Sequence, residues 1–138
     1  MALVLDTSVV VALLVLEDPA HGRCVDLVTE HDEDLVIPAP TLVEIDYRLR
    51  KYGAVRGWAT FVGDITGGRY QLHGVNEDAL RRAASLEVEY EDLGLGFVDA
   101  SVVVTCETLG ETKLATLDRR HFAVVRPRHC DALTLLPA

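Results

Sequence analysis

Residues 2–16 read ALVLDTSVVVALLVL, and this stretch decides the fold. Its first part, residues 2–5, is a short apolar run of the kind that forms a strand buried on both faces. The polar residues at 6–8 follow, and their side chains suit the start of a helix over residues 9–16. A buried strand that passes directly into a helix is typical of an α/β protein with a parallel sheet.

The same alternation continues along the chain. Short apolar runs predict further strands at Leu35–Ile37, Tyr70–Leu72, Lys113–Leu117 and Leu133–Leu136. Segments with apolar residues three or four positions apart predict helices over 19–30, between Pro40 and Gly53, and over 54–65, 76–91 and 97–109. We therefore expect one α/β domain over residues 1–138, with a mostly parallel sheet that helices cover on both faces.

The composition fits a folded protein, with 138 residues of which 49% are hydrophobic and 25% charged. The three cysteines include no C-x-x-C pair, so we expect neither a disulfide framework nor a zinc ribbon, and a reducing cytoplasm fits best. The apolar start of the chain contains Asp6 and is shorter than the roughly 20 residues that span a bilayer. No membrane segment is expected.

Acidic side chains outnumber basic ones by 22 to 13, which gives a formal net charge of −9. This balance argues against nonspecific binding to nucleic acid or to an anionic membrane. The distribution is uneven, because residues 1–112 hold 8 basic and 20 acidic side chains whereas residues 113–138 hold 5 and 2. In the helix at 76–91, the spacing predicts ion pairs four residues apart, namely Glu77 with Arg81 and Asp78 with Arg82.

Four acidic residues stand where predicted strands end or helices begin. Asp6 and Asp118 each end a strand, while Glu44 and Asp99 each lie in the first turn of a helix. In a parallel sheet with crossover connections, these positions share one edge of the sheet. Each acid alone has an ordinary explanation. Asp6 and Asp118 suit helix caps, Asp99 suits the positive end of a helix, and Glu44 completes a capping box with Thr41.

The combination of the four acids indicates a different role. Asp6 and Asp99 lie in apolar stretches without basic neighbours in the sequence, where an ionised carboxylate is costly unless it is paired or binds a metal ion. Converging carboxylates repel one another unless a cation neutralises them, and all-oxygen ligands select hard ions such as Mg²⁺ or Mn²⁺. We therefore expect a carboxylate-lined site for a divalent metal ion.

Four motifs carry a resemblance to a known family. They are Leu5-Asp6-Thr7-Ser8, Glu44 in the helix after Pro38-x-Pro40, Phe97-Val98-Asp99-Ala100, and ATLDRRHF at residues 115–122. In order and spacing they resemble the PIN-domain family, and the chain looks like a VapC-type toxin ribonuclease of a type II (VapBC) toxin-antitoxin system. The resemblance runs from Leu3 to Val125.

The resemblance implies a PIN-like three-layer α/β/α sandwich and a Mg²⁺-dependent endoribonuclease that hydrolyses phosphodiester bonds in single-stranded or looped RNA. By matching position, Asp6 and Asp99 would be the main metal ligands. Glu44 and Asp118 would complete the acidic catalytic site, directly or through water, and Mn²⁺ could substitute for Mg²⁺. A divalent ion there could lower the pKa of a water molecule and balance the charge that develops on the phosphate, so no histidine base is required.

Other residues receive supporting roles in the same way. Ser8 and Thr116 match hydroxyl positions that support the first and fourth acids. Arg119 and Arg120 follow the last acid and are candidates for contacts with the RNA backbone, since phosphate contacts mainly position a substrate. The alternative for these arginines is a solvated rim.

The resemblance also implies two protein partners, a second copy in a homodimer and a cognate VapB-type antitoxin in a hetero-oligomer. The helix after Pro40 carries an apolar stripe that we expect to be mostly core, made of Leu42, Ile45, Leu49 and Tyr52. Basic residues flank this stripe, namely Arg48, Arg50, Lys51 and Arg56. With Trp58 and Phe61 of the next helix, the stripe would shape the antitoxin groove, and an antitoxin arginine among the four carboxylates would compete with the metal ion.

Two alternatives remain open. One is a noncatalytic PIN module that only binds RNA or protein, which the intact set of acids disfavours. The other is a metal-dependent phosphatase or a phosphoaspartyl receiver domain, which also groups acids at strand ends. A receiver needs two adjacent acids after its first strand and a lysine after its last one. Here Asp6 stands alone, and Lys113 stands at the start of its strand, not after it.

Overall fold

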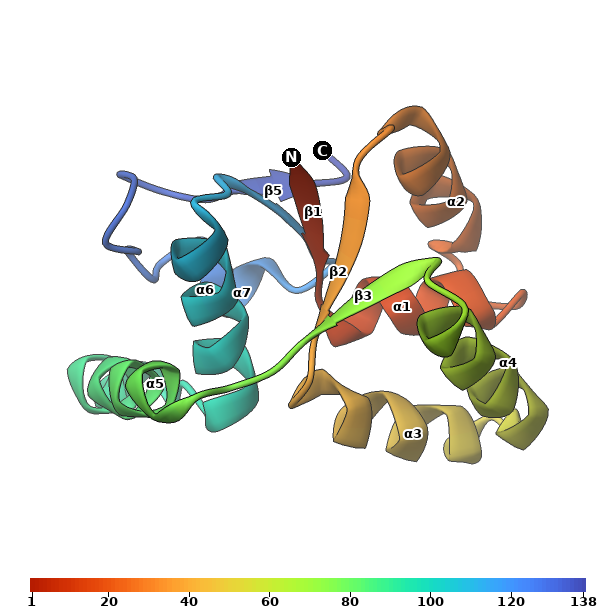
Figure 1. The fold of residues 1–138 in the computed structure, drawn as a ribbon, viewed down its shortest axis with the longest axis horizontal. Coiled ribbons are helices and arrows are strands. Elements are labelled where there is room, and N and C mark those ends of the chain that lie inside the picture. The colour runs from red at the N-terminus through yellow and green to blue at the C-terminus, as the bar shows by residue number, and fades with distance from the viewer.

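A computed structural model describes all 138 residues and shows a five-stranded sheet between two groups of helices (Figure 1). The strands lie in the order β3-β2-β1-β4-β5, with β1 at the centre. All neighbouring strands run parallel, which confirms the expectation from the sequence. The strands are β1 (Ala2–Leu5), β2 (Asp34–Pro38), β3 (Tyr70–His73), β4 (Lys113–Ala115) and β5 (Thr134–Leu136).

Helices cover both faces of the sheet and complete the predicted α/β/α sandwich. One core cluster joins the sheet to α1 through α4, and the other joins it to α5, α6 and α7. No helix combines the length and the apolar character needed to cross a membrane. The α-helices are α1 (Thr7–Leu14), α2 (His21–Glu30), α3 (Thr41–Lys51), α4 (Val55–Thr66), α5 (Glu77–Glu89), α6 (Phe97–Leu109) and α7 (Arg119–Phe122), and a 3₁₀ helix covers Glu91–Leu93.

The central strand β1 shows why its sequence is apolar at every position. Leu3 and Leu5 belong to the core cluster on the α1 side, whereas Val4 between them belongs to the cluster on the α6 side. This alternation follows from the pleat of a strand, which points successive side chains to opposite faces. All three side chains are fully buried, so a polar residue in β1 would face a core on either side of the sheet.

The strand β4 ends at Ala115, two residues before the predicted end at Leu117. Beyond it, the backbone N–H of Leu117 donates to the Ser8 hydroxyl (2.9 Å) and that of Asp118 donates to the Thr116 hydroxyl (3.0 Å). Side-chain hydroxyls thus take the place of a neighbouring strand as hydrogen-bond partners. The sheet gives way to a polar network at its carboxyl edge.

The predicted ion pairs within α5 are wrong. Arg81 pairs with Asp78 at 3.3 Å, one residue closer in sequence than Glu77, and both partners are exposed. Arg82 turns inward and donates two hydrogen bonds, of 3.0 and 2.9 Å, to the carboxylate of Glu107 on α6. Arg82 pairs with Glu107 and not with Asp78 because a buried carboxylate that accepts two hydrogen bonds binds a guanidinium more strongly than a carboxylate that is 91% exposed.

The Arg82–Glu107 pair gives a prediction for stability. Its side chains are 12% and 10% exposed, so Glu107→Gln leaves a buried guanidinium without its counter-charge. We expect this change to lower the free energy of unfolding by about 3 kcal/mol, measured by urea denaturation at pH 7. Arg81→Ala is the matched control on the same helix, and should cost less than about 1 kcal/mol because its ion pair is exposed.

The effect of Glu107→Gln should depend on pH. Burial by itself raises the pKa of Glu107, but hydrogen bonds from Arg82 and from the backbone N–H of Arg128 outweigh it and lower the pKa below its usual value. The stabilisation is therefore fully present above an unfolded pKa of about 4.3 and is lost as the pH falls through the lower folded pKa. Equal stability of the variant and the parent at pH 7 would contradict this account.

Candidate functional site

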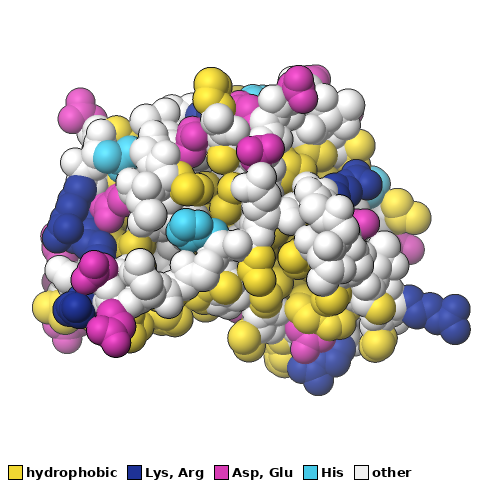
Figure 2. Space-filling model, in the orientation of Figure 1, with side chains coloured by type: hydrophobic (Ala, Val, Ile, Leu, Met, Phe, Trp, Pro, Cys, Tyr) yellow, Lys and Arg dark blue, Asp and Glu magenta, His cyan; other side chains and the backbone are white.

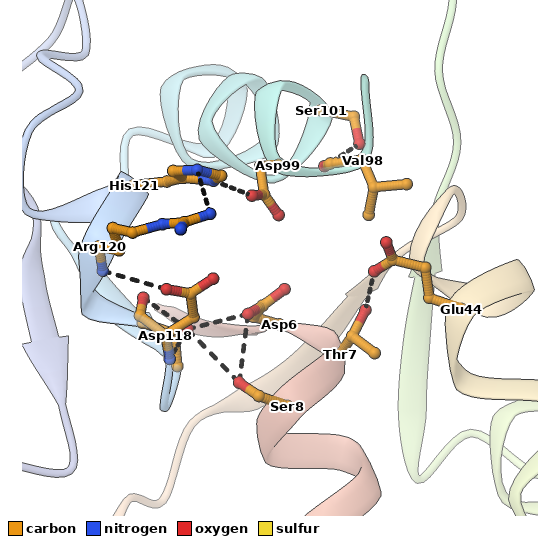
Figure 3. Close-up of polar contacts among 11 residues, drawn as sticks. Asp6, Thr7, Ser8, Glu44, Val98, Asp99, Ser101, Asp118, Arg120 and His121 are labelled. Atoms are coloured by element: carbon orange, nitrogen blue, oxygen red, sulfur yellow. Dashed lines mark hydrogen bonds and ion pairs between the residues drawn. The ribbon is translucent and has the colours of Figure 1, made fainter. Parts of the chain in front are cut away.

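Ten residues line a cleft of about 550 Å³ at the carboxyl edge of the sheet. All four acids that the sequence singles out are among them, although they come from four separate segments of the chain. Figure 3 shows their carboxylates around one open space. The acids are Asp6 after β1, Glu44 on α3, Asp99 on α6 and Asp118 before α7, and the other lining residues are Thr7, Ser8, Tyr47, Arg48, Lys51 and Tyr52.

Asp6 is the most buried of these acids. It is 4% exposed, and its Oδ2 accepts hydrogen bonds from the hydroxyls of Thr116 (2.8 Å) and Ser8 (3.2 Å). Its Oδ1 is buried without any partner. Burial raises the pKa of Asp6 to about 6, with a smaller contribution from the charge of Asp99, although the Thr116 hydroxyl lowers it. An unpartnered buried carboxylate oxygen is a strong position for a cation.

Asp6 does not act as the helix cap that its position suggested. It occupies the N-cap position of α1 with an extended backbone, but its side chain makes no capping hydrogen bond. The helix begins directly at Thr7, two residues earlier than expected. The Asp6 side chain turns instead toward the hydroxyls of Ser8 and Thr116, which leaves its second oxygen for the cleft.

Glu44 does not form the predicted capping box either. The hydroxyl of Thr41 donates to the backbone oxygen of Pro38 at 2.7 Å, and α3 begins after Pro40 without any side-chain cap. Because the cap is missing, Glu44 is free to face the cleft, where its Oε1 accepts a hydrogen bond from the Thr7 hydroxyl at 2.9 Å. This contact ties the first turn of α3 to the first turn of α1.

Asp118 does cap the short helix α7, as its position suggested. Its Oδ1 accepts a hydrogen bond from the backbone N–H of Arg120 at 3.0 Å. Its own N–H donates to Thr116, whose hydroxyl in turn donates to Asp6. One hydroxyl therefore connects the first and fourth acids of the cleft.

His121 is the site residue that the sequence reasoning missed. It is buried, and its Nδ1 lies 2.6 Å from Oδ2 of Asp99. Its Nε2 faces a guanidinium nitrogen of Arg120 at 3.3 Å. Because arginine can only donate, the hydrogen-bond network assigns the proton to Nδ1, so that His121 donates to Asp99. One side-chain atom of Asp99, one of Asp118 and one of His121 lie within 4.8 Å of one another, so His121 belongs to the same cluster, where it supports Asp99 through its proton.

The sequence signals for His121 were its place in the motif at residues 115–122 and its position three residues after Asp118. In a helical turn, that spacing places both side chains on the same side. The spacing alone is common, and the contact with Asp99 requires α7 to pack beside α6, which the sequence does not show.

The cations in the cleft are not the ones that the sequence suggested. Arg119 donates to the backbone oxygens of Leu135 (3.3 Å) and Pro137 (2.9 Å), so it holds the carboxyl-terminal segment. Neither Arg119 nor Arg120 lines the cleft. Arg48 and Lys51 of α3 line it instead. The RNA contacts expected at Arg119 and Arg120 remain a prediction.

One residue of the expected apolar stripe on α3 also belongs to the cleft. Ile45 and Leu49 are fully buried, as expected, but Tyr52 is 57% exposed and lines the cleft. The helix ends at Lys51, so Tyr52 leaves the helical path that would have carried it into the core.

Comparison with known proteins agrees with the fold. The family model of the PIN domain matches residues 3–126. Ribonuclease VapC26 of Mycobacterium tuberculosis is 26% identical over 98% of this chain and 100% of its own length. Two crystal structures share the fold. VapC20 of Mycobacterium tuberculosis, described as a sarcin-ricin loop cleaving toxin, has a TM-score of 0.82 and 18% identity, covering 93% of this chain and 98% of its own.

The second structure is VapBC2 from Rickettsia felis, bound to a DNA fragment from its promoter. It has a TM-score of 0.68 and 17% identity, covering 98% of this chain and 97% of its own. The family match covers most of the chain and includes all four acids of the cleft. The chain therefore belongs to the PIN-domain family.

Proposed function

We propose that this protein is a VapC-type toxin, an endoribonuclease that uses Mg²⁺ and is neutralised by a cognate antitoxin. The observation that carries the proposal is the cleft, where four carboxylates converge and one buried oxygen of Asp6 has no partner. The likeness to Ribonuclease VapC26 supports the activity, and the description of VapC20 supports RNA as the substrate class.

The donor set of the cleft fits a hard divalent cation. Asp6 and Asp99 would be its main ligands, and Glu44 and Asp118 would complete the site directly or through water, with Mn²⁺ as a substitute for Mg²⁺. A bound Mg²⁺ would lower the pKa of a water molecule and balance the charge that develops on the phosphate.

The protein's own residues hold the acids in place. The hydroxyls of Thr116 and Ser8 fix one oxygen of Asp6 and leave the other free. His121 keeps its proton at Nδ1 and holds Asp99, while Thr7 holds Glu44. Residues that support ligands in this way reduce the reorganisation needed when the site is loaded.

Because the chain is acidic overall, RNA must bind at a limited part of the surface and not through a general electrostatic attraction. Figure 2 shows basic side chains near the rim of one face, with no broad basic surface across it. With a net charge of −9, the chain would not hold RNA by general attraction. The acidic body suits a basic protein partner, and VapBC complexes among the solved structures support an antitoxin of the VapB type. We also propose a homodimer, and a reducing cytoplasm that suits the three free cysteines.

Substitution of the acids tests the activity. Asp6→Asn and Asp99→Asn should each reduce Mg²⁺-dependent RNA cleavage at least roughly 100-fold, because each removes charge from the site. The measurement is sequencing of the RNA ends produced by the purified protein, with and without EDTA. The control is Asp46→Asn, an acid of α3 that pairs with Arg50 outside the cleft.

Two results would overturn the proposal. One is cleavage by either cleft variant at the rate of the parent protein. The other is the absence of any cleavage by the parent with Mg²⁺ or Mn²⁺, which would favour a noncatalytic PIN module.

The pKa of Asp6 predicts how pH affects the metal-free protein. Burial raises this pKa from 3.8 to about 6, so between these values the folded chain binds a proton that the unfolded chain has released. Asp6 therefore costs stability as the pH rises through this range, up to about 3 kcal/mol above pH 6. Asp6→Asn removes this cost. In EDTA, the variant should withstand more urea than the parent at pH 8 and about the same at pH 4.

Added Mg²⁺ should reduce or reverse the difference in stability between Asp6→Asn and the parent. At pH 8 it should stabilise the parent but not Asp6→Asn, and the stabilisation should fade below about pH 6 as protons compete for the carboxylate. If Asp6→Asn were less stable than the parent in EDTA at pH 8, the cost assigned to the buried charge would be wrong.

The antitoxin partner can be tested by co-expression. We expect the chain to co-purify with the product of the neighbouring upstream gene, and RNA cleavage to fall when that protein is bound. A chain that purifies alone in repeated experiments would count against a toxin-antitoxin system.

A further inference from the structure

One face of α3 continues the cleft outward from the acids. Glu44, Tyr47, Arg48 and Lys51 line the cleft from one side of the helix, and Tyr52, just after the end of the helix, lines it as well. We call this set the α3 cleft face. Lys51 stands seven residues after Glu44, about 10 Å further along the axis at 1.5 Å per residue. Glu44 therefore lies at the inner end of this face, in the same cleft as the other three acids, and the cations lie along its outer part.

The two cations of this face have no acidic partner. Neither Arg48 nor Lys51 lies within ion-pair distance of a carboxylate, whereas the neighbouring Arg50 pairs with Asp46 at 3.6 Å. What sets these two unpaired cations apart is their place, because both line the cleft that holds the four acids. They leave a site for an anion next to a site for a cation.

Exposed aromatic side chains accompany these cations. Tyr47 is 53% exposed and Tyr52 57%, and the ammonium group of Lys51 lies 4.9 Å from the centre of the Tyr47 ring. Tyr52 has no aromatic or cationic partner, so its ring is available for stacking. Cations that follow a phosphate backbone, combined with aromatic rings that stack on bases, form the usual binding mode for single-stranded nucleic acid.

We propose that the α3 cleft face is a subsite for an unpaired RNA strand. Arg48 and Lys51 bind phosphates beside the one at the acids, and Tyr52 stacks on a neighbouring base. The subsite rests on the proposed ribonuclease function, and it assigns the binding of the RNA strand beside the acids to Arg48, Lys51 and Tyr52.

Charge favours RNA over an antitoxin segment as the occupant of this face. A basic segment that competes for the four carboxylates would be repelled by Arg48 and Lys51. A phosphate chain has the opposite preference, because it is attracted by these cations and reaches the acids only where a metal ion offsets their charge.

The test measures binding separately from cleavage. The full-length protein with Asp99→Asn, which suppresses cleavage, is titrated into a labelled single-stranded oligoribonucleotide at a fixed concentration of Mg²⁺, and binding is followed by fluorescence anisotropy over a range of monovalent salt. Arg48→Ala and Lys51→Ala should each weaken binding severalfold and reduce the slope of log K against log salt by about 0.7, the value for one phosphate contact with a single strand.

The tyrosine should behave differently from the cations. Tyr52→Ala should weaken binding roughly tenfold with an unchanged salt slope, and Tyr52→Phe should restore binding because it keeps the ring. Arg50→Ala is the control, since it removes a cation of the same helix that is already paired and does not line the cleft. A duplex of the same sequence should bind more weakly than the single strand.

The outcomes separate this proposal from the ribonuclease function. If the parent cleaves RNA but Arg48→Ala and Lys51→Ala bind it as well as Arg50→Ala does, the subsite is wrong and the ribonuclease stands. If these variants keep RNA binding but lose the antitoxin, the face belongs to the antitoxin and the subsite is again wrong. If the parent does not cleave RNA but binding depends on the face as described, the subsite stands without the ribonuclease.

Discussion

The burial of Asp6 at the end of the central strand is the constraint on which the site depends. An ionised carboxylate in this position must be compensated, and the chain supplies only the hydroxyls of Ser8 and Thr116 for one of its two oxygens. The same two hydroxyls accept hydrogen bonds from the backbone N–H groups of Leu117 and Asp118, which lie beyond the end of β4. The cost of burying Asp6 is therefore linked to the geometry of the sheet edge, and a cation is the natural partner for the second oxygen.

The layers and the convergence of the acids could be predicted because they depend on patterns within short segments. The apolar run at 2–5 and the alternation of strands with helices require a covered parallel sheet, whose carboxyl edge collects whatever follows each strand. Three details depend on contacts between distant segments and were missed. Arg82 pairs with Glu107 on another helix. Glu44 accepts a hydrogen bond from Thr7 and forms no capping box. His121 contacts Asp99 only because α7 packs on α6.

These misses share a physical reason. A local rule such as an i,i+4 ion pair is worth a few tenths of a kcal/mol, roughly 0.2–0.5, whereas a buried charge without a partner costs several times as much. The partners of Arg82 and Asp99 are therefore set by tertiary contacts, with Glu107 and His121 respectively, and not by neighbours on their own helices. The cap of Asp118 could be predicted because that hydrogen bond joins residues two positions apart and depends on no distant segment.

The net charge of −9 and an RNA substrate are compatible because the cleft separates the two signs of charge. The acids gather at the inner end, around the unpartnered oxygen of Asp6, while Arg48 and Lys51 stand further along α3 without partners of their own. If the cations stood among the acids they would pair with them, which would neutralise the metal site and remove the attraction for phosphate. This separation lets the same cleft attract a cation and a polyanion at adjacent positions, while the net charge of −9 disfavours nonspecific binding of RNA to the chain.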